Sequence, residues 1–194
     1  MNTTYILHGG GTRKGYALNS AFFSEFTKSV TNKDVKILMC YWARERNTWN
    51  DLLAEDIDSV NKETDKSTSF HIVTDANDLF SKIDEYDVLY VRGGDPDLIE
   101  PYYKELGNLK TKLKGKVYLG SSMGAFLVST SYVLSLDSQD TSTVHKGLGI
   151  LPINILCHWD VESQKQKKLD LLTDAAQGLP ILTIDECQYS KFTF

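Results

Sequence analysis

Apolar runs and amphipathic stretches alternate regularly along the first two thirds of the chain. Five short runs rich in β-branched and aromatic residues predict strands, at residues 4–8, 35–40, 69–73, 87–91 and 117–119. The intervening segments carry apolar residues at helical spacing and predict helices, at residues 17–30, 50–64, 76–83 and 97–107. Apolar strands alternating with helices are typical of a mostly parallel sheet with both faces covered. The pattern therefore predicts an α/β fold, a three-layer sandwich.

This alternation changes in the last third of the chain. Residues 131–143 are rich in Ser, Thr and Asp between apolar positions, which favours a hairpin over a further strand–helix unit. Later elements are expected in this order: a glycine-punctuated turn at 147–152, a strand at 153–158, a helix at 161–176, and closing strands at 179–184 and 188–194. No internal repeat or linker interrupts the pattern, and 194 residues suit one well-buried core. We expect a single domain, 1–194.

Charge and cysteine content narrow the partners and the compartment. The net charge is −5 and no basic run stands out, which argues against nucleic acid or an anionic membrane as the main partner. Three cysteines, Cys40, Cys157 and Cys187, form no C-x-x-C pair and favour reduced thiols. Neither a signal-peptide pattern nor a membrane-spanning apolar stretch is visible. We expect a soluble, cytoplasmic protein.

The stretch YLGSSMGAFLVS, residues 118–129, carries the strongest chemical signal. It runs from a strand through G-x-S-x-G into an apolar helical segment, which is the pattern of a nucleophile elbow. Such a turn projects the serine, here Ser122, out of the sheet at the start of a helix whose free N–H groups face the same space. A simple packing turn between strand and helix would also explain these glycines. Ser122 therefore needs partners elsewhere in the chain.

Loops after parallel strands gather at one edge of a sheet, where ligands bind. That edge should hold Ser122 and the loops at 9–11, 41–47 and 93–94. The glycines at 9–11 satisfy neither the P-loop pattern nor G-x-G-x-x-G, so a plain turn is favoured there. No histidine or cysteine cluster has metal-ligand spacing. We expect no metal and no cofactor.

A nucleophilic serine needs a base, and a carboxylate to orient that base. The chain has four histidines, His8, His71, His145 and His158. His158 follows an apolar strand and precedes a predicted helix, where a base on the active edge would lie. Spacing leaves the acid open among four residues, Asp137, Asp160, Asp185 and Glu186.

Three motifs occur in the order found in a known family. They are RGGD at residues 92–95, GSSMGA at 120–125, and GLGILP at 147–152 leading to His158. Together they resemble the dipeptidase E (aspartyl dipeptidase) and cyanophycinase family of serine peptidases, from the first glycine loop to about Glu186. The resemblance implies a class I glutamine amidotransferase-like (flavodoxin-like) fold, with serine where those enzymes carry cysteine.

The resemblance also implies roles for particular residues. Ser122 matches the family nucleophile and His158 its general base. Gly94 matches a glycine whose N–H lies in the oxyanion hole, and the N–H of Met123 would be the second donor. Three side chains depart from the family, because Met123 stands where alanine is usual, Arg92 where a small residue is usual and Cys157 where a proline is usual. Backbone donors do not depend on the side chain, so we expect the oxyanion hole to be kept.

For the acid, the resemblance supplies two positions. Glu186 matches the carboxylate that completes a Ser-His-Glu triad, and Asp137 matches an aspartate also proposed for that role. Glu186 is preferred because the end of a closing strand lies on the same edge as Ser122. Arginines that could receive a substrate carboxylate are Arg44, Arg46 and Arg92, although solvated arginines are commoner.

The resulting hypothesis is a serine hydrolase that cleaves a small peptide or related amide through an acyl-enzyme. One alternative is an α/β-hydrolase-type esterase, suggested by HGGG at residues 8–11 together with G-x-S-x-G. Another is a catalytically degenerate, amidotransferase-like binding domain, suggested by Met123 and Arg92. A small peptide or amide is the expected partner, and a homodimer is left open.

Overall fold

A six-stranded sheet forms the centre of the structure, a computed structural model that describes residues 2–135, 142–175 and 178–194. Its strand order is β10-β1-β5-β4-β2-β3, and only β10 runs antiparallel to its neighbour. The strands are β1 (Thr4–His8), β2 (Asp34–Cys40), β3 (Ser67–Ile72), β4 (Val88–Val91), β5 (Val117–Ser121) and β10 (Tyr189–Thr193). The predicted α/β class with a mostly parallel sheet is confirmed.

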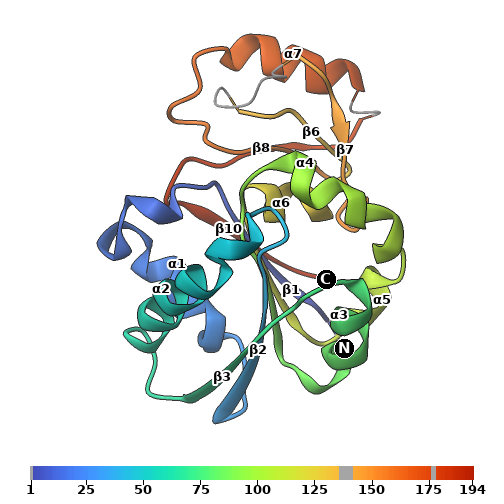
Figure 1. The fold of residues 1–194 in the computed structure, drawn as a ribbon. Coiled ribbons are helices and arrows are strands. Elements are labelled where there is room, and N and C mark those ends of the chain that lie inside the picture. The colour runs from blue at the N-terminus through green and yellow to red at the C-terminus, as the bar shows by residue number, and fades with distance from the viewer. Residues whose placement is uncertain (1, 136–141, 176–177) are drawn as a thin grey trace.

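Helices cover both faces of this sheet, as predicted for a three-layer arrangement. Figure 1 shows α1 (Tyr16–Lys28) and α2 (Trp49–Asn61) together on one side, with α3 (Ala76–Lys82) and α5 (Leu109–Lys112) on the other. The further helices are α4 (Pro96–Ile99), α6 (Met123–Val128), α7 (Lys165–Ala175) and four 3-10 segments, Thr12–Lys14, Arg46–Thr48, Ile83–Glu85 and Glu100–Leu106. None of the helices in the described ranges is long and apolar enough to cross a membrane.

The strand register brings the predicted loops to one edge. His8 pairs with Ser121 at the ends of β1 and β5, and Val91 at the end of β4 pairs with Gly120. The central strands are apolar on both faces and their side chains are buried, which is the reason for their continuous apolar sequence. The loops after β1, β4 and β5 therefore emerge side by side.

A second, four-stranded sheet lies at this end of the central sheet, together with α7 (Figure 1). Its order is β7-β6-β8-β9, with β6 (Ser131–Tyr132), β7 (His145–Lys146), β8 (Asn154–Leu156) and β9 (Ile181–Thr183). The hairpin predicted at 131–143 corresponds in part to the antiparallel pair β6–β7, whose second strand begins two residues beyond that range. Of the two expected closing strands, only β10 joins the central sheet. β9 pairs with β8 instead, and the separate sheet was not predicted.

Two helical predictions differ from the structure. The segment expected as one helix at 97–107 is divided into α4 and a 3-10 helix that begins at Glu100 and has Pro101 in its first turn. Proline has no N–H to donate, so the α-helical hydrogen-bond ladder is interrupted there. The last helix begins at Lys165 rather than at Val161, whose side chain is exposed.

Candidate active site

Ser122 stands on a strained turn between β5 and α6. Its backbone angles are φ 50° and ψ −108°, an unusual conformation for a residue with a Cβ. Hydrogen bonds hold it there, because the Ser122 N–H donates to His8 O (2.9 Å) and the Ser122 carbonyl accepts from Phe126 N (3.0 Å). The side chain is thereby aimed away from the sheet edge, as a nucleophile elbow requires.

Glycines around this turn permit the close approach of three backbones. A Cβ added to Gly120 would lie 2.4 Å from Gly124 O, and one added to Gly124 would lie 2.0 Å from Val91 O. Gly93, from the loop after β4, faces Ser122 directly, because its added Cβ would be 2.7 Å from the Ser122 Cβ. Only glycine fits at these positions, which explains the motif spacing.

His158 lies next to the serine. Its ring Nε2 is 3.1 Å from Ser122 Oγ, and its backbone N–H donates to Gly9 O (2.9 Å). Like Ser122 it has a positive φ, 56°. The ring packs against the first glycine loop, where a Cβ on Gly10 would be 2.2 Å from the imidazole Cε1. That loop is therefore part of the histidine site, although its sequence indicated only a plain turn.

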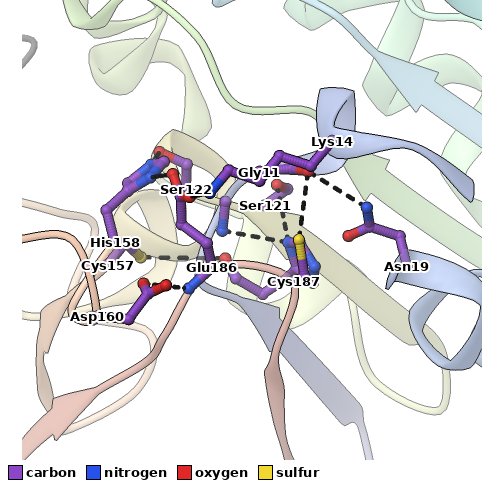
Figure 2. A network of polar contacts seen from close by, with 12 residues as sticks. Gly11, Lys14, Asn19, Ser121, Ser122, Cys157, His158, Asp160, Glu186 and Cys187 are labelled. Atoms are coloured by element: carbon purple, nitrogen blue, oxygen red, sulfur yellow. Dashed lines mark hydrogen bonds and ion pairs between the residues drawn. The ribbon is translucent and has the colours of Figure 1, made fainter. Parts of the chain in front are cut away.

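Glu186 completes a hydrogen-bonded line with the histidine and the serine (Figure 2). Its Oε1 is 2.6 Å from His158 Nδ1, and its backbone N–H donates to Asp160 Oδ1 (2.8 Å). Burial raises the pKa of Glu186, but the bonds from Lys14 and His158 outweigh burial and leave that pKa below its usual value. The side chain is therefore a carboxylate near neutral pH.

The four acids considered from the sequence are thus placed differently. Glu186 contacts the imidazole, Asp160 supports the Glu186 backbone, and Asp185 is exposed. Asp137 lies outside the described residues. Backbone hydrogen bonds, the one from Glu186 foremost, lower the pKa of Asp160 and keep it a charged acceptor.

A cavity of about 620 Å³ opens in front of Ser122. Gly94, Met123 and His158 line it, together with two residues whose part in it the sequence did not predict, Phe126 and His145. His145 lies on β7, with its Nδ1 3.4 Å from Glu100 Oε1 and its ring stacked on Tyr132. The pairing of β7 with β6 places His145 opposite Tyr132, in a strand just beyond the hairpin predicted at 131–143.

Gly94 and Met123, where oxyanion donors are expected, both line this cavity. A Cβ on Gly94 would lie 1.9 Å from Ala43 O, so a residue with a larger side chain would clash at this position. Met123 is the first residue of α6, where backbone N–H groups have no partner within the helix, and its side chain is buried.

The three arginines considered as anion receptors have different surroundings. Arg44 lines the cavity, and its Nε donates to Gly93 O (2.6 Å). Arg92 is only 2% exposed, and its Nη1 forms an ion pair with the buried Asp56 (2.9 Å). Arg46 lies over the ring of Trp49. The suggestion that Arg92 binds a substrate carboxylate is therefore wrong, since the buried carboxylate already takes its charge.

The two remaining histidines, His8 and His71, have polar partners other than Ser122. His8 is buried beneath the turn, with Nδ1 accepting from Gly10 N (3.2 Å) and lying 3.3 Å from Ser121 Oγ. Burial lowers the pKa of His8 to about 4, so the ring is neutral at ordinary pH. His71 pairs with Asp78 (3.0 Å) on a half-buried surface. In the described ranges, no three His, Cys, Asp or Glu side chains are grouped to hold a metal ion.

A parallel α/β fold with a serine on the strand–helix turn, and a histidine bonded to it, is typical of serine hydrolases. The model of one family, described as Peptidase family S51, matches residues 5–191. The chain therefore belongs to peptidase family S51 and is a serine peptidase. This confirms the resemblance to the dipeptidase E family.

Solved structures give the same fold at low sequence identity. A peptidase from an acI-B1 Actinobacterium has 17% identity and a TM-score of 0.67, over 99% of this chain and 84% of that one. A candidate peptidase E protein from Listeria monocytogenes EGD-e has 15% identity and a TM-score of 0.63, over 100% of this chain and 98% of that one. A comparison with curated proteins finds no match.

Proposed function

We propose that this serine peptidase cleaves small peptides or related amides through an acyl-enzyme formed on Ser122. The observation that carries the proposal is the continuous line from Ser122 Oγ to His158 Nε2 (3.1 Å) and from His158 Nδ1 to Glu186 Oε1 (2.6 Å). A serine hydroxyl is a weak nucleophile until a neighbouring base removes its proton. His158 is within hydrogen-bond reach for that transfer.

Each member of the line has a distinct part in the reaction. Ser122 Oγ attacks the peptide carbonyl while His158 Nε2 takes the hydroxyl proton, and the imidazolium then gives that proton to the leaving amine. Glu186 accepts from Nδ1–H, which selects the tautomer with a free Nε2 lone pair and stabilises the imidazolium. Water, activated in turn by His158, then releases the acyl group and restores the serine.

Charge that develops on the carbonyl oxygen needs donors in front of Ser122. We assign these to the N–H groups of Gly94 and Met123, both of which line the cavity. Loss of one such donor commonly removes about 3 kcal/mol of transition-state stabilisation. Because both donors belong to the backbone, the methionine side chain does not abolish them.

Several broader expectations belong to the same proposal. We assign residues 1–194 to a single peptidase E-like domain with a class I glutamine amidotransferase-like fold and no cofactor. We also propose a cytoplasmic location and exclude nucleic acid and membranes as main partners, on the net charge of −5. Burial raises the pKa of the Cys40 thiol to about 12, which suits a protein with reduced, unreactive cysteines. A homodimer is the assembly to compare with a monomer by light scattering.

The alternatives have less support. The α/β-hydrolase esterase places its acid between serine and histidine in the chain, whereas here the order is Ser122, His158, Glu186. A degenerate binding domain would not need a carboxylate behind a histidine bonded to the serine.

The test is labelling by a fluorophosphonate probe, which reacts with activated serines. We expect wild-type protein to be labelled at Ser122 and Ser122→Ala to lose all labelling while its circular dichroism and melting temperature stay unchanged. The matched control is Ser121→Ala, which removes the neighbouring hydroxyl, bonded to His8 and buried, and should still be labelled. An unlabelled wild type, or labelling that survives Ser122→Ala, would contradict the proposal.

A further inference from the structure

Glu186 has two carboxylate oxygens, and they have different partners. Oε1 contacts His158, while Oε2 forms an ion pair with the ammonium of Lys14 (Figure 2). The side chain of Glu186 is 12% exposed and that of Lys14 is 49% exposed. The negative charge that faces the histidine is therefore shared with a cation that reaches in from the surface.

Hydrogen bonds fix the backbone loop that carries Lys14. Lys14 ends the 3-10 helix Thr12–Lys14, and its N–H donates to Gly11 O (2.9 Å). The amide of the buried Asn19 donates to both ends of this loop, to Gly11 O (3.2 Å) and to Gly15 O (2.9 Å). Gly11 and Gly15 both have positive φ, at 80° and 103°, which glycine adopts readily.

The same loop is bonded to the segment that bears the acid. The N–H of Cys187, the residue after Glu186, donates to Gly10 O (2.8 Å), and the Cys187 thiol lies 3.6 Å from Gly11 O. Lys14 and Glu186 thus approach each other from two segments that are tied together by the backbone. The two backbone segments that carry the contact are therefore fixed relative to each other.

From this arrangement we propose that Lys14 is a positioning residue of the Ser122–His158–Glu186 line, which holds Glu186 in one orientation and sets the lowest pH at which that line is active. The inference rests on the proposed function. Nothing in the sequence patterns singled out Lys14.

The direction of the effect follows from charge alone. The charged and titratable groups around Glu186 are Lys14, His158, Asp160, Cys187 and, further off, His8. A cation in contact with the carboxylate opposes the addition of a proton to that carboxylate. Lys14 therefore keeps Glu186 charged, and able to orient His158, at a lower pH than the carboxylate would stay charged without it. Removal of this charge should move the acid side of the pH–rate profile upward.

The experiment measures the rate of fluorophosphonate labelling of Ser122 against pH, which requires no known substrate. In Lys14→Met we expect the acid limb to move to higher pH by about half a unit to one unit at low salt. Lys14→Arg should restore the wild-type limb, and about 0.5 M salt should narrow the difference, because the ammonium is half exposed. The control Lys28→Met makes the same charge change at the far end of α1 and should leave the limb unchanged.

Nuclear magnetic resonance gives a second readout that is independent of the labelling rate. The side-chain carboxyl carbon of Glu186, titrated in Ser122→Ala protein with and without Lys14→Met, should show the same upward displacement. An unchanged limb and an unchanged titration in Lys14→Met would overturn the inference. A wild type that is not labelled at Ser122 would instead overturn the proposed function, so the two failures can be told apart.

Discussion

Gly10→Ala is the most informative single substitution, because it displaces the proposed base without changing any of the proposed catalytic residues. The added Cβ would lie 2.2 Å from Cε1 and 2.4 Å from Nε2 of His158. Non-bonded carbons require about 3.5 Å, so either the ring or the loop must retreat by about 1.3 Å. The loop is tied down, since Gly10 O accepts from Cys187 N and Gly9 O accepts from His158 N.

We therefore expect the imidazole to move away from Ser122. The Oγ–Nε2 separation of 3.1 Å would then exceed the hydrogen-bond limit. A misplacement of about 1 Å in a catalytic group can lower the rate by about 100-fold. The fluorophosphonate labelling rate at Ser122 should fall by at least this factor. Because φ of Gly10 is 102°, alanine should also destabilise the fold by about 1–3 kcal/mol.

The matched control separates the steric effect from backbone strain. Gly149 also has a positive φ, 62°, but a Cβ added there meets nothing within 4 Å. Gly149→Ala should lower the unfolding free energy by about 1–2 kcal/mol through backbone strain and lower the melting temperature by a few degrees. Its labelling rate should be unchanged. If Gly10→Ala were labelled within about threefold of Gly149→Ala, the reasoning from the His158 contact would be refuted.

Two further substitutions test the acid and the buried arginine. Glu186→Gln should lower the labelling rate by about 10²- to 10⁴-fold, because an amide can hold the wrong imidazole tautomer. It should also remove part of the acid dependence of stability. Because the pKa of Glu186 is lowered in the folded state, its contribution to the unfolding free energy is present above the unfolded-state pKa and is lost as the pH falls through the folded-state pKa. Urea unfolding midpoints measured between about pH 6 and pH 3 would detect this loss. Arg92→Met leaves the buried Asp56 without its cation, although the Tyr41 hydroxyl still donates to it, and should cost about 3–5 kcal/mol of unfolding free energy by urea titration. Labelling of Ser122 in the remaining folded protein should persist, and its loss would mean that Arg92 acts on the site after all.

The sequence predicted the central sheet well, because each of its inner strands is a continuous buried apolar run. Most elements of the second sheet were predicted, but not that they form a sheet of their own. The pairings of β6 with β8 and of β8 with β9 join segments that lie far apart in the sequence, and no local pattern indicates them. Pro101 accounts for the divided helix near residue 100, and the late start of α7 agrees with the exposure of Val161.

The contacts among the proposed site residues were only partly predictable. Ser122 and His158 follow from motif and position, and Glu186 from the resemblance. Lys14 could not be found in the same way, because an exposed lysine in a glycine loop has no distinguishing pattern until the fold brings it to Glu186. The prediction that Arg92 could bind a substrate carboxylate was wrong because the sequence shows only its neighbours, two glycines and an aspartate at the edge that carries Ser122. The Arg92 side chain points into the protein, toward Asp56.

The pairing of β10 with β1 has a consequence for how the enzyme is made. Glu186 is carried on the connection between β9 and β10, and β10 is held against the first strand, with Thr3 N–H donating to Phe194 O (2.7 Å). A folding intermediate in which β10 is not yet paired with β1 has nothing to hold the carboxylate behind His158. If Glu186 acts as proposed, we expect peptidase activity to appear only after β10 has paired with β1.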